Sequence, residues 1–348
     1  MTTPDSIPAE LDRVQAGGTL SEPLAFALFD AVFSGLVPDP QVFNLLRSLA
    51  HRGPTIDELV GAARAMRRHA TPVPLGLAAN AAPLPILDTC GTGGAPKLFN
   101  VSTIGAIVTA SAANGRVLVA KHGNRSRTGR GSAELLETLG LNIHASPETQ
   151  GRCLREVGIC FSFAPDHHPG ARHAAAARKA LGTPTIFNLL GPLCNPAGAT
   201  RQLIGTYSEH NAALLAAALA RLGAEHAMVV TSRDGLDELT TTAPNLTFHV
   251  GGARVEPREI DAKTLGFAPA TIATLQADTL ESATRVAREV LNGHPGPTTD
   301  IVVLNAAASL LVSGVATDMA EGVSQAREAL ASGRARQTLD RWIIAAKA

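Results

Sequence analysis

The chain has 348 residues, of which 30 are lysine or arginine and 30 are aspartate or glutamate. The formal net charge of zero gives no basic excess of the kind that attracts nucleic acid or an anionic membrane. Only 3% of residues are aromatic, which leaves few side chains for stacking bases, and the length favours two domains.

The first seventy residues are predicted to be helical. Apolar residues recur at helical spacing in segments 20–35 and 39–53, each of which ends at a glycine. The next segment begins with Thr55 and Glu58, which have the spacing of a capping box. A proline-rich stretch without periodicity follows, so we predict a domain boundary near residue 75.

Beyond residue 75 the pattern changes to strands, loops and helices. Alternating elements of this length predict a mostly parallel sheet that is covered by helices. Strands are predicted in 85–88, 116–123, 141–145, 159–165, 201–208 and 227–232, with a hairpin in 246–256 around two glycines. The last eighty residues are predicted to be mostly helical, with 320–347 as one long helix. The expected fold class is α/β, with a small N-terminal helical domain.

Cysteine usage and hydropathy favour a soluble, cytoplasmic protein. The N-terminus lacks a basic stretch followed by an apolar run, so we expect no signal peptide. No apolar run approaches the roughly 20 residues that span a bilayer. The four cysteines show no metal-ligand spacing and are expected to be reduced and buried: Cys90, Cys153, Cys160 and Cys194.

The stretch DTCGTGGAPKLFNVST (88–103) joins a predicted strand to a predicted helix. Its glycines allow backbone N–H groups to approach an anion closely. Asn100, Ser102 and Thr103 stand at the start of the helix, where free N–H groups and the helix dipole favour phosphate. The stretch matches neither the P-loop nor the dinucleotide-binding pattern, and a plain turn with a helix cap remains open.

The stretch KHGNRSRTGRGSAE (121–134) has four basic side chains in its first ten residues. Lysine and arginine beside glycine, serine and threonine suit a phosphate or pyrophosphate. We call this stretch the strap. A solvated charged surface is the alternative, although the position between a strand and a helix makes it less satisfactory.

The stretch SRDGLDELT (232–240) places Asp234, Asp237 and Glu238 at the end of a predicted strand. One or two carboxylates together with substrate phosphates are the usual ligands of Mg²⁺. The alternative is an acidic helix start that the helix dipole favours.

Two further stretches have unusual composition. Segment 164–182 carries His168 and Arg178, which lie nearly three helical turns apart, and an arginine suits an organic carboxylate. A histidine metal site is disfavoured there because no third ligand stands at regular spacing. Segment 185–198 is apolar and is interrupted by Gly191-Pro192 and Asn195-Pro196, so we interpret it as a rigid wall of the site and not as a source of reactive groups.

Taken together, these stretches resemble the anthranilate phosphoribosyltransferase family. The resemblance rests on GTGG…FNVST, KHGNRS…GSAELLETLG, APDHHP…ARKALGTPTIFNLLGPLCNPAG, DGLDELTT and VLNAAASLL, in that order, and covers essentially the whole chain. It implies a nucleoside phosphorylase/phosphoribosyltransferase type of fold. The helical domain would comprise 1–75, joined by helices from about 168–190, and the catalytic domain would comprise 76–348.

The resemblance also implies a reaction and the residues that bind its substrates. Anthranilate would attack phosphoribosyl pyrophosphate with the help of Mg²⁺, in a cytoplasmic homodimer that forms through the helical domain. The phosphoribosyl pyrophosphate site would contain Gly91, Gly94, Ala95, Asn100, Ser102, Thr103, Lys121, Arg125, Ser126 and Ser132. The anthranilate site would contain Gly91, His122, Asn124, His168, Arg178 and Pro192. The magnesium ligands would be Ser102, Asp237 and Glu238.

The chain departs from the family pattern at four places. Ala95 replaces the usual aspartate, Leu98 the usual threonine, and Thr231 the usual histidine. The strap is one residue shorter and gains Arg127 and Arg130, which we expect to compensate for the missing polar contacts. We interpret the chain as a variant of the family that retains activity.

Two other functions remain open at this stage. A pyrimidine nucleoside phosphorylase would share the same plan of a helical domain and an α/β domain. A non-catalytic relative that binds nucleic acid would use the same scaffold, but the net charge of zero and the acidic pair disfavour it.

Overall fold

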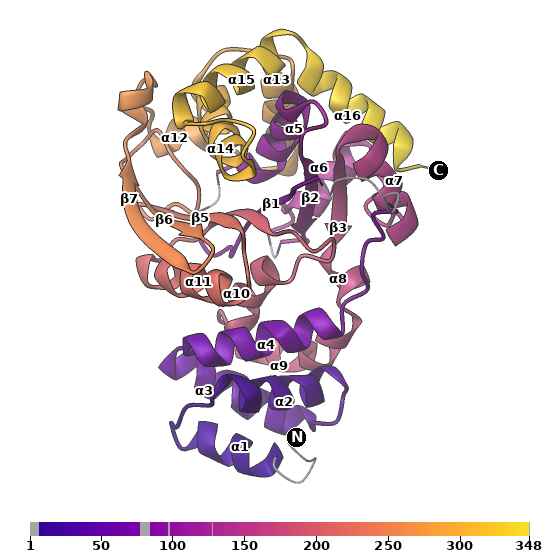
Figure 1. The fold of residues 1–348 in the computed structure, drawn as a ribbon, viewed down its shortest axis with the longest axis vertical. Coiled ribbons are helices and arrows are strands. Elements are labelled where there is room, and N and C mark those ends of the chain that lie inside the picture. Colours follow the sequence, from indigo (N-terminus) through magenta and orange to yellow (C-terminus); the bar gives the residue numbers. More distant parts are fainter. Residues whose placement is uncertain (1–6, 77–83, 97, 127, 348) are drawn as a thin grey trace.

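The computed structural model describes residues 7–76, 84–96, 98–126 and 128–347, and its N-terminal part is a group of helices (Figure 1). The predicted capping box is present, because the Glu58 N–H donates to Thr55 Oγ1 at 3.2 Å and the Thr55 N–H donates to Glu58 Oε2 at 2.8 Å. The helices of this part are α1 (Ile7–Gln15), α2 (Glu22–Phe33), α3 (Asp39–Arg52) and α4 (Ile56–Arg68). None of the described helices is long and apolar enough to cross a membrane.

A seven-stranded sheet forms the centre of the described chain, in the order β3-β2-β1-β4-β5-β6-β7. The first five strands of that order are parallel, and β5, β6 and β7 pair antiparallel. The mostly parallel sheet and the hairpin are therefore confirmed. The strands are β1 (Ile86–Gly91), β2 (Leu118–Gly123), β3 (Ile159–Phe163), β4 (Arg201–Gly205), β5 (His226–Ser232), β6 (Asn245–Gly251) and β7 (Arg254–Ile260).

Helices cover both faces of this sheet (Figure 1). On one face α5 packs on β1 and β2, and α14 packs on β4 and β5. On the other face α11 packs on β5 and β6, and it also contacts α4. The α-helices after β1 are α5 (Val101–Ala113), α6 (Ser132–Leu139), α7 (Pro147–Val157), α8 (Ala164–His167), α9 (Ala175–Leu181), α10 (Ile186–Leu193), α11 (Glu209–Arg221), α12 (Ile272–Leu275), α13 (Leu280–Leu291), α14 (Pro297–Ser313), α15 (Met319–Ala331) and α16 (Arg334–Ala345). Two short 3₁₀ helices, η2 (Pro169–Ala174) and η3 (Ala262–Leu265), complete the described elements.

The helical part shares a hydrophobic core with one face of the sheet. Leu45 of α3, Leu215 of α11 and Val229 of β5 are fully buried members of the same apolar cluster. From the middle of the chain, η2 packs against α2 and α9 packs against α3. The division of the chain at residue 75 stays a prediction, because the apolar contacts continue from one part into the other.

Three secondary-structure predictions are wrong. Segment 141–145 is not a strand: Leu141 and Ile143 are buried, but β1 and β3 already occupy both edges of β2. Segment 320–347 is not one helix, because the chain turns at Gly333, whose φ is +74°. Segment 185–198 is not broken at Gly191-Pro192, because α10 continues to Leu193.

Candidate active site

The loops that follow β1, β2, β4 and β5 meet at one edge of the sheet, because these strands are parallel neighbours. Gly91 at the end of β1 is in register with Gly205 at the end of β4. A Cβ atom at Gly205 would lie 1.7 Å from the Asp237 carbonyl oxygen, so only glycine lets the acidic loop approach this closely. The two loops predicted to bind phosphate and metal are thus brought together.

The Gly-rich loop leads from β1 into α5, which begins at Val101. Gly94 has a φ of +103°, and a Cβ atom there would lie 2.6 Å from the ring of Tyr207. Asn100 precedes the helix without a side-chain cap, and its Nδ2 donates instead to the Arg130 carbonyl oxygen of the strap at 3.1 Å. The N–H groups at the start of α5 therefore lack a side-chain cap from Asn100, which suits an anion.

The two unusual residues of this loop have different surroundings. Leu98 is 6% exposed and belongs to the apolar core. Where the family usually has a polar threonine, this chain therefore has an apolar side chain that packs in the core. Ala95 is half-buried and offers no polar side chain. The apolar centre of the loop therefore anchors it to the core and leaves its backbone to bind an anion.

Lys121 of β2 is a buried cation beneath these loops. Its side chain is 1% exposed, and Nζ donates to the Thr89 carbonyl oxygen at 2.6 Å and to Ser102 Oγ at 3.3 Å. Burial lowers the pKa of Lys121, while the neighbouring Asp88 carboxyl opposes this shift. Burial also raises the pKa of Asp88, although the His122 N–H donates to its Oδ1 at 3.0 Å. The ionisable side chains of Lys121 and Asp88 are thus buried beside the Gly-rich loop.

Glu238 connects this cation to the acidic loop. Burial, and after it the nearby Asp237 carboxylate, raise the pKa of Glu238 to about 8, while Lys121 and the Ser102 backbone N–H oppose the rise. Ser102 and Glu238 line the same small cavity. A cation placed there would relieve the repulsion between the two carboxylates.

The donor set fits Mg²⁺. No group of three or more histidine, cysteine, aspartate or glutamate side chains is arranged to hold a metal within the described parts of the chain. Two carboxylates and a serine hydroxyl are nevertheless hard oxygen ligands, and Mg²⁺ commonly completes its shell with water and substrate phosphate. Asp237, Glu238 and Ser102 are the residues that would hold it.

A pair of buried histidines lies beside the end of β2. The rings of His122 and His168 are 5.0 Å apart between centroids, and His122 Nδ1 lies 3.1 Å from the Gly191 carbonyl oxygen. Burial lowers the pKa of His122 to about 3 and that of His168 to about 4, so both are neutral at pH 7. His122 Nε2 is buried and has no hydrogen-bond partner among the described residues, which suits contact with a polar ligand group.

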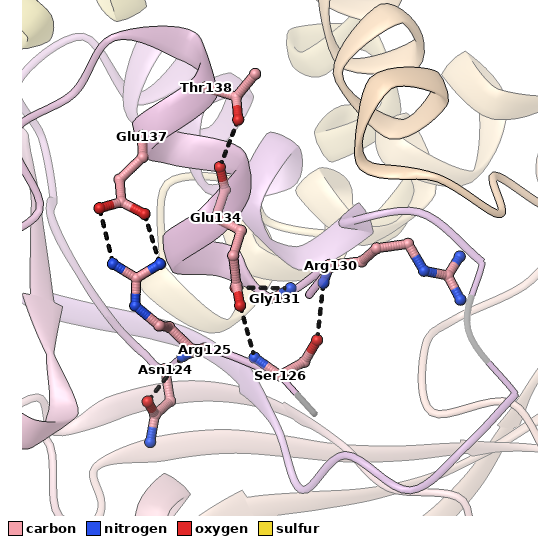
Figure 2. Close-up of polar contacts among 8 residues, drawn as sticks. All are labelled: Asn124, Arg125, Ser126, Arg130, Gly131, Glu134, Glu137 and Thr138. Atoms are coloured by element: carbon pink, nitrogen blue, oxygen red, sulfur yellow. Dashed lines mark hydrogen bonds and ion pairs between the residues drawn. The ribbon is translucent and has the colours of Figure 1, made fainter. Parts of the chain in front are cut away.

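Two of the predicted arginines contact other side chains in this structure. The Arg125 guanidinium forms a two-pronged ion pair with Glu137 of α6 at 2.6 and 2.8 Å (Figure 2). The same guanidinium lies 5.7 Å from the centroid of the Phe163 ring. Arg178 is exposed and stacks over Phe187 at 4.8 Å. Both guanidinium groups therefore have protein partners in this structure.

The strap is attached to the Gly-rich loop through side chains. Thr103 Oγ1 donates to Ser132 Oγ at 3.0 Å, in addition to the bond from Asn100 to the strap backbone. Of the two arginines expected to compensate for Ala95, Arg127 lies outside the described residues. The Arg130 guanidinium donates to the Ala277 carbonyl oxygen, which precedes α13. The structure thus connects Arg130 to that segment, and its compensating role stays a prediction.

Sequence reasoning assigned no role to Asp88 or Tyr207. Asp88 is fully buried in β1 and interacts with Lys121. The one feature of the sequence that indicates this role is a carboxylate at the end of a predicted apolar strand. Tyr207, which follows β4, lies close to Gly94 of the Gly-rich loop, a proximity that no sequence pattern indicates.

Comparisons with known proteins agree with this arrangement. Residues 84–336 match the glycosyl transferase family α/β domain, and residues 10–70 match the helical bundle domain of the same family. The chain is 44% identical to the anthranilate phosphoribosyltransferase of Rubrobacter xylanophilus, over 96% of this chain and 95% of that one. It is 46% identical to the enzyme of the same name from Solibacter usitatus, over 91% and 92% of the two chains.

Solved structures give the same result. The chain is similar to anthranilate phosphoribosyltransferase from Thermus thermophilus, with a TM-score of 0.89, 39% identity and coverage of 97% and 99% of the two chains. It is also similar to the Saccharomyces cerevisiae enzyme, solved in complex with phosphoribosyl pyrophosphate and magnesium, with a TM-score of 0.88, 25% identity and 99% coverage of both chains.

Proposed function

Because the chain belongs to the anthranilate phosphoribosyltransferase family, we propose that it transfers the phosphoribosyl group of 5-phosphoribosyl 1-pyrophosphate to the amino group of anthranilate. The products are N-(5-phosphoribosyl)anthranilate and pyrophosphate, and the reaction belongs to tryptophan biosynthesis. The observation that carries this proposal is the position of Ser102. Its hydroxyl accepts a hydrogen bond from Lys121, and its backbone N–H donates to Glu238, so it joins the anion-binding loop to the carboxylate pair.

The residues of the site divide into three groups in this proposal. Ser102, Asp237 and Glu238 would hold Mg²⁺, which would supply positive charge to the pyrophosphate leaving group. The phosphoribosyl pyrophosphate site comprises Gly91, Gly94, Ala95, Asn100, Ser102, Thr103, Lys121, Arg125, Ser126 and Ser132. The anthranilate site comprises Gly91, His122, Asn124, His168, Arg178 and Pro192.

These residues act by positioning and by charge. The bond between C1 and the pyrophosphate oxygen breaks, a bond from the anthranilate nitrogen to C1 forms, and the nitrogen releases one proton. An aromatic amine is largely unprotonated at pH 7, so this nucleophile needs no strong base. The neutral histidine pair is consistent with that, because His122 and His168 add no positive charge beside the amine. Catalysis therefore rests on orientation and on stabilising the leaving group.

The test is the loss of anthranilate fluorescence with purified protein, phosphoribosyl pyrophosphate and Mg²⁺. We expect consumption that stops when either phosphoribosyl pyrophosphate or Mg²⁺ is omitted. Phosphorolysis of thymidine or uridine without consumption of anthranilate would overturn the proposal in favour of a nucleoside phosphorylase. Salt-sensitive binding of single-stranded DNA without either activity would favour the nucleic-acid-binding alternative.

We also propose a homodimer through the helical part, in the cytoplasm. Leu36, between α2 and α3, is 70% exposed and supports an apolar contact at that surface. Light scattering should give twice the mass of one chain, and Leu36→Glu should shift it toward a monomer. A monomeric mass for the unmodified protein would contradict the dimer.

A further inference from the structure

Within the strap, Gly131 lies against the backbone of Asn124 and Ser126, so this part of the strap forms a loop with a closed base. A Cβ atom at Gly131 would lie 2.6 Å from the Ser126 nitrogen and 2.7 Å from the Asn124 carbonyl oxygen. Gly131 has an ordinary φ of −78°, so the need for glycine comes from this close approach and not from backbone strain. Residues 124 and 131 are therefore held together at the base of the loop.

Glu134, in the first turn of α6, holds this base closed. Its Oε1 accepts the Ser126 N–H at 3.3 Å, and its Oε2 accepts the Gly131 N–H at 2.9 Å (Figure 2). Each carboxylate oxygen thus binds one end of the loop. Hydrogen bonds to a charged acceptor are stronger than neutral ones, and two of them fix both ends together.

The direction of this carboxylate matters because the loop is basic. A glutamate near a phosphate site would repel the ligand if its charge were left unbalanced. Both oxygens of Glu134 instead face N–H groups of the strap itself. The negative charge of Glu134 is therefore directed at these two N–H groups, which fixes the conformation of the loop.

The closed loop is connected to the Gly-rich loop as well. The Arg130 N–H donates to Ser126 Oγ at 2.9 Å, inside the strap, and the Arg130 carbonyl oxygen accepts from Asn100 at 3.1 Å. A shift of Ser126 or Gly131 would therefore move Arg130 and loosen its bond to Asn100. Through these hydrogen bonds, the conformation that Glu134 fixes in the strap also affects the position of Asn100 at the start of α5.

We propose that Glu134 is a positioning residue for phosphoribosyl pyrophosphate, which it serves by closing the strap without touching the substrate. The proposal rests on the proposed function. It assigns to Glu134 an effect on the Michaelis constant for phosphoribosyl pyrophosphate, in addition to the contribution to stability that a carboxylate at a helix start makes anywhere.

The experiment compares Glu134→Ala and Glu134→Gln with a matched control. Glutamine keeps the length and one acceptor oxygen but loses the second acceptor. Glu321→Ala is the control, because Glu321 also lies in the first turn of a helix, α15, and accepts the Thr317 N–H at 2.8 Å, a partner outside the strap. Steady-state kinetics and melting temperature are measured for all three.

We expect the Michaelis constant for phosphoribosyl pyrophosphate to rise about tenfold in Glu134→Ala and about threefold in Glu134→Gln, with kcat changed less than about twofold. Glu321→Ala should lower the melting temperature and leave that constant unchanged. If Glu134→Ala does not fold, Glu134→Gln carries the same test. An unchanged constant in every Glu134 variant that folds would show that Glu134 is only a helix cap and would overturn the proposal.

Failure of this inference differs from failure of the proposed function. If the unmodified protein does not consume anthranilate, the proposed function fails. If the unmodified protein is active but the Glu134 variants keep its Michaelis constant, only the role of Glu134 fails.

Discussion

The centre of the candidate site and the strap are held together by different interactions. Around Lys121 and Glu238 the pKa values depart from their ordinary range because charges are buried beside one another. In the strap, exposed Arg125 pairs with Glu137, and the shape comes from hydrogen bonds to backbone groups. The centre is therefore organised by buried charge and the strap by hydrogen-bond geometry, so substitutions should affect the two regions differently.

The largest effect is expected where the buried cation is removed. Lys121→Met would leave Asp88 and Glu238 without it and should lower the free energy of unfolding by about 3–5 kcal/mol, with nearly complete loss of transfer activity. Urea unfolding and the anthranilate assay measure both quantities. Lys179→Met, an exposed lysine in α9, is the control. A loss below about 1 kcal/mol would mean that the centre does not depend on this charge.

The next effect concerns Glu238. Glu238→Gln should lower the rate of transfer about 100-fold at saturating Mg²⁺. The folded-state pKa of about 8 lies above the ordinary 4.5, so the contribution of Glu238 to stability is present below pH 4.5 and is lost as the pH rises through 8. Without Mg²⁺, Glu238→Gln should therefore raise the melting temperature relative to the unmodified protein, by an amount that grows as the pH rises from 4.5 to about 8.

The matched control for this experiment is Asp234→Asn, since Asp234 is an exposed acid in the same loop. It should leave both the rate and the dependence of melting on pH unchanged. Equal effects of the two substitutions would contradict a specific role for Glu238.

A smaller effect should come from the buried histidine pair. The pKa of His168 is lowered to about 4 from an ordinary 6.5, so its contribution to stability is present above pH 6.5 and is lost as the pH falls through 4. The free energy of unfolding falls when the pH is lowered from 7.5 to 5, and in His168→Phe this fall should be smaller than in the unmodified protein by about 1–2 kcal/mol. His51→Phe, at an exposed histidine, is the comparison variant. The same reduction in both would mean that burial of His168 is not the cause.

The smallest effect should appear in the exposed part of the strap. If Arg125 leaves Glu137 to bind phosphoribosyl pyrophosphate, Glu137→Gln should lower the Michaelis constant for this substrate about twofold, and Arg125→Ala should raise it several-fold. Changes of the same sign in both variants would instead identify the ion pair as a structural connection. Neither substitution should alter the melting temperature as much as Lys121→Met.

The sequence alone predicted those parts of the fold that local patterns determine. Alternation of strands and helices predicted the mostly parallel sheet, and the spacing of Thr55 and Glu58 predicted a capping box that the structure contains. Segment 141–145 shows the limit of this reasoning, because an alternating pattern cannot reveal that both edges of β2 are already paired. Strand pairing depends on the whole sheet.

The candidate site divides in the same way. The sequence indicated an anion-binding loop, a basic strap and an acidic pair, because glycine, arginine and carboxylate chemistry is visible in the residues themselves. Only the tertiary structure decided that Lys121 is buried against Asp88, that Leu98 packs in the core, and that Arg125 lies on Glu137. Burial and ion pairing depend on residues that are distant along the chain. They determine the protonation state of each ionisable group and whether its side chain can contact a ligand.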